Sequence, residues 1–118
     1  MKKREFAYTT PDGTTWQGTV ESEVNCGYNL IDYARVELEA ERDDCTLRLK
    51  FSRDLVEHLG GQGQKSVSED LYVERYINGV GIDRDLIDVS GGRPHVVDLD
   101  AAGEWGKIVR EALASIGR

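Results

Sequence analysis

The clearest pattern of apolar and polar positions lies in residues 34–51. Every second residue is apolar along 34–40 and again along 45–51. A two-residue period is typical of β-strands that bury one face. We therefore expect the chain to turn between Arg42 and Cys45 and to form an antiparallel hairpin. The expected cross-strand pairs are Val36 with Phe51, Leu38 with Leu49 and Ala40 with Leu47 on the apolar face, and Glu37 with Lys50 and Glu39 with Arg48 on the polar face.

A second hairpin is expected near the N-terminus. The residues before Pro11-Asp12-Gly13 alternate between apolar and polar, and these three residues favour successive positions of a tight turn. Pairing outward from the turn places Tyr8 opposite Trp16 and Phe6 opposite Gly18. Together the two hairpins predict a four-stranded, largely antiparallel sheet.

Helical signals occur later in the chain. Ser52 can cap a short helix that ends at Gly60-Gly61. Ser66-Val67-Ser68-Glu69 fits a capping box and predicts a helix through Ile77, stopped by Asn78-Gly79. The strongest helix is expected at the C-terminus, where apolar residues recur at helical spacing. These are Trp105, Ile108, Val109, Ala112, Leu113 and Ile116.

Residues 82–89 have two interpretations. Asp83 can cap a single helical turn, or residues 86–89 can pair with residues 95–99 around the turn-forming residues 91–94. We favour the second, a third hairpin. The pattern as a whole predicts an α+β fold, in which an antiparallel β-sheet built from two or three hairpins is packed on one face by two or three α-helices. The length predicts a single α+β domain, 1–118.

Charge and composition narrow the function. The formal net charge of −7 argues against direct nucleic-acid binding and against anionic membranes, because phosphate contacts need clustered Lys and Arg. The basic start at residues 1–4 is followed by no apolar segment, so neither a signal peptide nor a membrane span is expected and the protein is predicted to be cytoplasmic. Cys26 and Cys45 are then expected to be free thiols.

Motifs for cofactors and metals are incomplete. The segment 60–66 resembles a phosphate-binding loop, but Gln64 stands where a Gly must precede the Lys. Residues 83–88 lack the central Gly and the terminal Glu of a calcium loop. No Cys or His pair has the spacing of a zinc site. We therefore predict no cofactor and no metal.

Enzyme chemistry has no local signature in this chain. A Gly-x-Ser-x-Gly elbow is absent, and no catalytic residue is predicted. A small enzyme of unknown reaction would need His58 or His95 in a pocket beside Cys26 or a carboxylate. A homo-oligomeric structural protein is the other alternative, and it would expose an unpaired strand edge or an apolar patch.

The preferred hypothesis is a small, soluble, acidic binding protein that acts by protein–protein interaction as an inhibitor, immunity factor or adaptor. Its partner is expected to be a protein, with a basic surface as one option. The polar strand pairs match Glu with Lys or Arg, which leaves the turn as the strongly negative part of the hairpin. Tyr72 and Tyr76 share one side of the predicted helix. The predicted binding residues are Glu41, Asp43, Asp44, Tyr72 and Tyr76.

Overall fold

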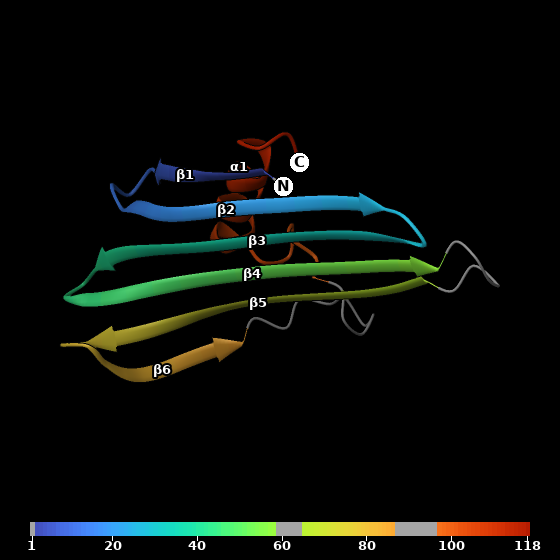
Figure 1. Ribbon diagram of the computed structural model, residues 1–118. Coiled ribbons are helices and arrows are strands. Elements are labelled where there is room, and N and C mark those ends of the chain that lie inside the picture. The colour runs from blue at the N-terminus through green and yellow to red at the C-terminus, as the bar shows by residue number, and fades with distance from the viewer. Residues whose placement is uncertain (1, 59–64, 87–96) are drawn as a thin grey trace.

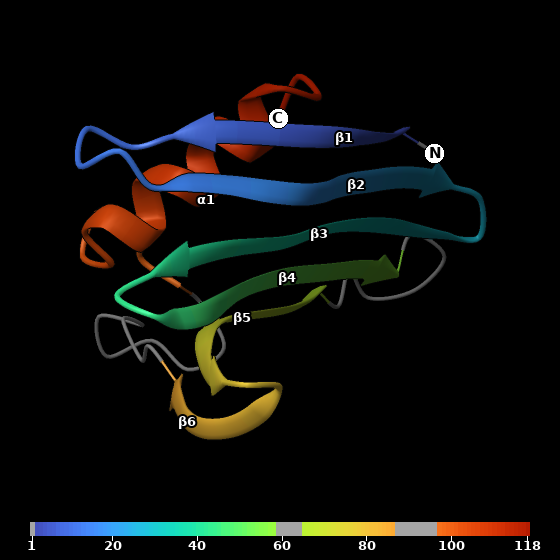
Figure 2. The same cartoon turned by 90° about the vertical axis from the view of Figure 1, so that its left-hand side faces the viewer.

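The computed structural model describes residues 2–58, 65–86 and 97–118 and shows a six-stranded antiparallel β-sheet with one α-helix on one face (Figures 1 and 2). The strands lie side by side in their order along the chain. They are β1 (Lys2–Thr9), β2 (Thr15–Cys26), β3 (Asn29–Arg42), β4 (Cys45–His58), β5 (Lys65–Ile77) and β6 (Val80–Leu86), followed by the helix α1 (Glu104–Ala114).

The two predicted hairpins are confirmed, with their registers. In β1 and β2, Tyr8 pairs with Trp16 and Phe6 with Gly18. In β3 and β4, every predicted pair is formed, and Asp43 and Asp44 make the turn between Arg42 and Cys45. Alternation specified these registers because a slip of one residue would move every apolar side chain to the opposite face.

The expected packing of the sheet by two or three helices is wrong. Strands account for 66% of the described residues and one short helix for 11%. The helix predicted after Ser52 is the second half of β4, which continues to His58. The helix predicted over residues 66–77 is β5. The fold is therefore a mainly antiparallel β-sheet, and the sheet has six strands in the described residues rather than four.

The capping box does not begin a helix, because pairing with β4 decides the conformation of β5. Val67, Leu71 and Val73 alternate on the helix-facing side, as strand residues do. Glu69 interrupts this apolar alternation, but it lies opposite Arg53 and forms an ion pair with a 3.1 Å distance between Nη2 and Oε2. A long ladder of strand pairs outweighs a local helix-start preference, which is a weak signal.

The signals after β5 were also misinterpreted. Asn78 and Gly79, expected to stop a helix, form the turn between β5 and β6 with φ angles of 52° and 79°. An Asn-Gly pair with positive φ is the usual two-residue hairpin turn. A hairpin was expected between residues 86–89 and 95–99. Leu86 instead pairs with β5, and residues 97–99 are not in a strand. The remaining part, 87–96, lies outside the described residues.

The core lies between α1 and the side of the sheet that faces it. The predicted C-terminal helix is confirmed, and Ile108, Val109, Ala112 and Leu113 bury its apolar stripe. The sheet contributes fully buried side chains from its four central strands: Trp16, Val20, Val36, Leu49, Phe51 and Leu71. No helix in the described part of the chain is both long and apolar enough to cross a membrane.

Candidate functional site

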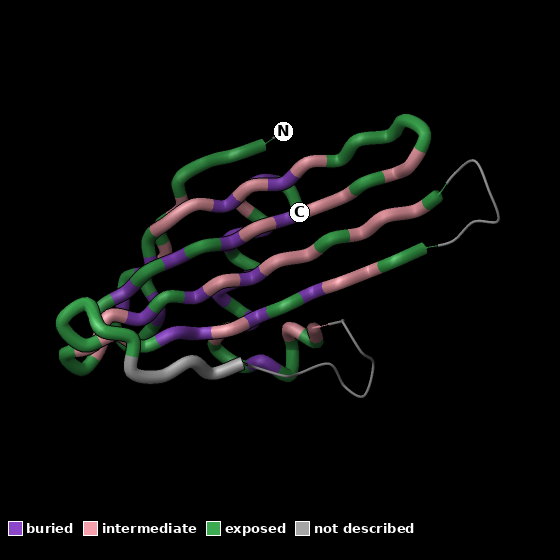
Figure 3. The backbone as a smooth tube through the Cα atoms, turned by 60° about the horizontal axis from the view of Figure 1, so that its bottom comes forward, coloured by how far each residue is buried: buried purple, intermediate pink, exposed green. Residues whose placement is uncertain are grey.

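The face of the sheet opposite α1 is covered by no described element (Figures 2 and 3). We call this side of β1–β5 the open face. By the strand registers it carries nine carboxylates and four Lys or Arg side chains, so a formal charge of −5 lies on this face out of −7 for the whole chain. The carboxylates are Glu5, Glu21, Glu23, Glu37, Glu39, Glu41, Asp54, Asp70 and Glu74, and the cations are Lys3, Arg35, Arg48 and Lys50.

The sheet brings three of the predicted binding residues to this open face. Glu41 pairs with Thr46 and Thr46 with Tyr76, so Glu41 and Tyr76 lie in one row across three strands. Tyr72 lies four residues from Tyr76 on the same face of β5. The prediction that the two tyrosines share one side holds, although they belong to a strand. Residues four apart share a face in a strand because its period is two.

Asp43 and Asp44 form the turn at the end of this face. Both are exposed, and both have positive φ, 52° and 63°. Two successive left-handed residues make a two-residue turn whose twist matches that of the flanking strands. The turn therefore holds both carboxylates in solvent, one residue beyond the Arg42–Cys45 pair.

Arg42 fixes the position of this acidic turn. Its guanidinium lies 6.0 Å from the ring centroid of Trp16 and 5.6 Å from that of Trp105. It also forms ion pairs with Asp12 at 3.3 Å and with Glu104 at 3.1 Å. These contacts join the end of β3 to the first hairpin turn and to the start of α1. Sequence patterns did not reveal this anchor, because the partners of Arg42 come from two distant segments of the chain.

The tyrosine rings are packed against cations of the neighbouring strand. The Arg48 guanidinium lies 4.7 Å from the Tyr76 ring centroid and forms an ion pair with Glu39 at 2.9 Å. The Tyr76 hydroxyl donates to Glu74, which raises the pKa of Tyr76 above its usual value of 10. The hydrogen bond from Arg48 to Glu39 raises the pKa of Arg48 in turn. This chain of contacts crosses β3, β4 and β5.

The expected neutralisation of the acidic strand is only half realised. Glu39 and Arg48 form their ion pair, as the register suggested. Glu37 lies opposite Lys50, but the Lys50 ammonium points to the Tyr72 ring, 5.9 Å from its centroid. Among the described residues, the Glu37 carboxylate has no hydrogen bond or ion pair. Glu37 on the open face therefore lacks the ion pair that the register suggested.

The residues proposed for an enzyme are not gathered in the described structure. His58 is exposed at the end of β4, where its Nδ1 lies 3.0 Å from Asn29 Oδ1. Cys26 lies at the same end of the sheet but points to the opposite face. Cys45 lies at the other end, and both thiols are free. His95 lies outside the described residues.

The described residues contain no group of three or more His, Cys, Asp or Glu side chains arranged to hold a metal ion. Hollows do occur on both sides of the sheet. One, of about 530 Å³, lies on the helix side beside Arg42, Cys45 and Trp105. Two others adjoin on the open face around Gly18.

In comparisons with known proteins, no family model matches the chain, and no match was found among curated proteins or solved structures.

Proposed function

We propose that this protein is a noncatalytic binding protein whose open face docks on a basic surface of another protein. The observation that carries the proposal is the charge of that face, −5 out of −7, on a sheet surface that no described element covers. Acting as an inhibitor, immunity factor or adaptor, it would occlude the partner's surface without changing it chemically. The negative face then steers the encounter and selects the partner, since charge complementarity affects association rate and specificity most.

A basic protein suits this face better than the other classes of partner. Nucleic acid and anionic lipid are repelled by the excess of carboxylates. A second copy of the chain, docked face to face, would bring like charges together, which disfavours association. A surface rich in Lys and Arg instead places its cations beside unpaired carboxylates. Contacts between opposite charges then replace contacts with solvent.

The two tyrosines supply the apolar contact area. Tyr72 and Tyr76 are half-buried, and each ring already packs against a cation of β4. Tyrosine is enriched in the residues that dominate binding energy, because a rigid ring buries a large area at low entropic cost. We assign the tyrosines to affinity and the acidic turn of Asp43 and Asp44 to the rate of association.

The acidic turn offers a test that keeps its geometry. In Asp43→Asn/Asp44→Asn both charges are removed, while Asn accepts positive φ at least as well as Asp. The protein is immobilised, exposed to an extract of its native cells, and the retained proteins are identified by mass spectrometry. The identified partner is then purified, and its association rate is measured at low and high salt. We expect the variant to associate more slowly, by about tenfold at low salt, and the difference to shrink as salt is raised.

A matched control removes the same number of charges on the helix side. Asp98→Asn/Glu111→Gln changes two exposed carboxylates in the same chemical way, and it is expected to leave the association rate unchanged. Equal rates for the turn variant and the wild-type protein would show that the acidic turn is not part of the contact surface. A partner that is itself acidic would refute the proposed charge complementarity.

A further inference from the structure

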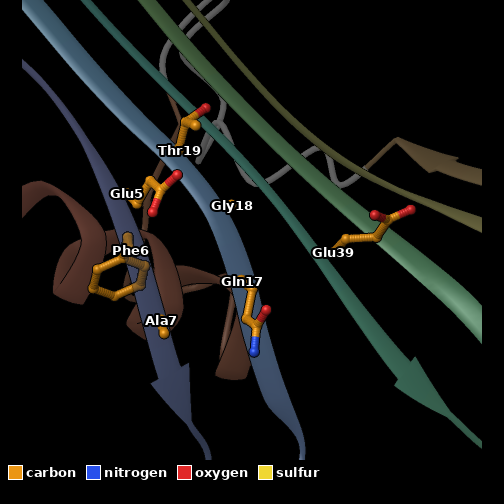
Figure 4. A pocket seen from close by; sticks show the side chains of 7 residues that line it. All are labelled: Glu5, Phe6, Ala7, Gln17, Gly18, Thr19 and Glu39. Carbon is orange, nitrogen blue, oxygen red and sulfur yellow. The ribbon is translucent and has the colours of Figure 1, made fainter.

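Two adjoining hollows on the open face form one shallow groove across β1–β4. The first, of about 510 Å³, is lined mainly from β1 and β2 (Figure 4). The second, of about 240 Å³, extends it to β4. They share Gln17, Gly18 and Glu39. The groove lies next to the row of Glu41 and Tyr76, so it is continuous with the surface proposed above.

The groove exists because side chains on this part of the face are short. Ala7 and Thr19 present little bulk between the longer residues of β1 and β2. Gly18, between them in β2, belongs by register to the helix-facing row of Phe6 and Leu38, and a Cβ at this position would lie 1.9 Å from the Glu37 carbonyl oxygen. Only glycine fits such a close approach.

Two carboxylates without partners border the groove. Glu5 pairs with Thr19 and Thr19 with Glu37, so the two acids flank a short hydroxyl side chain in one row. Their backbones lie about 10 Å apart, given the usual spacing between strands. Neither carboxylate has a hydrogen bond or ion pair within the described residues, whereas Glu39 is already paired with Arg48. A cationic side chain lying over Thr19 would therefore find opposite charge on both sides.

We propose that this groove receives an extended segment of the partner protein that carries Lys or Arg side chains, one of them placed between Glu5 and Glu37. This inference rests on the proposed function and specifies how the partner is recognised. From β1 to β4 the groove spans about 14 Å, which matches about four residues of extended chain. Charge complementarity thus selects the segment, and the short side chains of the groove admit its backbone.

The test uses a defined probe and the full-length protein. A fluorescent six-residue peptide with two lysines separated by one serine is titrated at low salt, and its counterpart with glutamates serves as the negative probe. Amide chemical shifts of the labelled protein locate the binding site. We expect the largest shifts at Gly18, Thr19 and the residues paired with them. We expect Glu5→Gln/Glu37→Gln to weaken binding of the lysine peptide by roughly three- to tenfold, the size expected for losing two exposed charge pairs.

Two further variants separate the groove from general acidity. Glu21→Gln/Glu23→Gln removes the same charge from the same face outside the groove, and it is expected to change binding less than twofold. Ala7→Trp fills the groove without changing charge, and it is expected to weaken binding at least as much as the double charge variant. Unfolding midpoints of all variants are compared with that of the wild type, so that loss of fold is not mistaken for loss of binding.

Equal weakening by both charge pairs, or no effect of Ala7→Trp, would overturn the groove as the recognition site. If the purified partner still depends on Asp43 and Asp44 but not on Glu5 and Glu37, the groove is refuted while the proposed function stands. If the partner depends on neither pair, both proposals fail.

Discussion

The buried ion pair between Arg53 and Glu69 offers the most direct test of how β5 is held in the sheet. The Glu69 side chain is only 7% exposed, and the Arg53 side chain is 33% exposed. Arg53 Nε donates to Glu69 Oε2 at 3.2 Å, and Arg53 Nη2 forms the ion pair with the same oxygen at 3.1 Å. Arg53→Met removes the charge but keeps a long side chain over Phe51, whose ring centroid lies 5.8 Å from the guanidinium carbon.

Three variants separate the two sides of the pair. Arg53→Met leaves a carboxylate buried without its cation, which we expect to cost about 2–3 kcal/mol, somewhat less than the usual loss for a fully buried pair because the Arg53 side of this pair is partly exposed. Glu69→Leu leaves a cation that can turn to water, so we expect a loss of only about 1 kcal/mol. The double variant replaces the pair by apolar residues, and its stability is expected to lie within about 1 kcal/mol of the wild type.

Urea unfolding followed by circular dichroism measures these free energies. Constant slopes of free energy against urea will show that the unfolded states are comparable. With the double variant at wild-type stability, the expected coupling between Arg53 and Glu69 is about 3–4 kcal/mol. A loss below about 0.5 kcal/mol for Arg53→Met, the size of an ordinary surface change, would refute the reasoning that this pair compensates the buried charge of β5.

Two further predictions concern the helix and the first turn. Gly106→Ala in α1 should destabilise the protein by about 2–3 kcal/mol in urea unfolding, because the new Cβ would lie 1.8 Å from the Leu99 carbonyl oxygen, although the same change in an open helix stabilises. A stable Gly106→Ala variant would show that the two segments are not in close contact. Hydrogen bonds from Thr10 and Thr14 lower the pKa of Asp12 to about 2 from 3.8. The resulting stabilisation is present above pH 3.8 and is lost as pH falls toward 2. In Asp12→Asn, the free energy of unfolding should therefore change less over this pH interval than it does in the wild type. The same pH dependence in the variant and the wild type would contradict this prediction.

Local patterns determined the two hairpins and the terminal helix. Alternation in residues 34–51 fixed the register of β3 and β4, because only one register buries all apolar side chains while pairing Glu with Lys or Arg. The turn at Pro11-Asp12-Gly13 did the same for β1 and β2. The stripe from Trp105 to Ile116 is long enough for its period to exclude a strand.

Sequence signals were ambiguous where one segment satisfied two local patterns. Residues 66–77 carry both a capping box and an alternation that Glu69 interrupts. The interruption is explained only by Arg53, which lies 16 positions earlier in the chain. Asn78-Gly79 is compatible with a helix stop and with a hairpin turn, and the choice depends on whether β5 is a strand.

The candidate site, too, was determined partly by the sequence and partly by the tertiary structure. The sequence alone determined which residues are acidic or aromatic and that Glu41 and the Asp43–Asp44 turn end a hairpin. Only the tertiary structure decided that β5 adds Tyr72 and Tyr76 to the same open face, that Lys50 turns to Tyr72 and leaves Glu37 unpaired, and that β1–β4 enclose a groove at Gly18. Alternation is a property of neighbouring positions and can be read along the chain. A hollow or an unpaired charge depends on side chains from distant segments, whose approach is set when the whole sheet assembles.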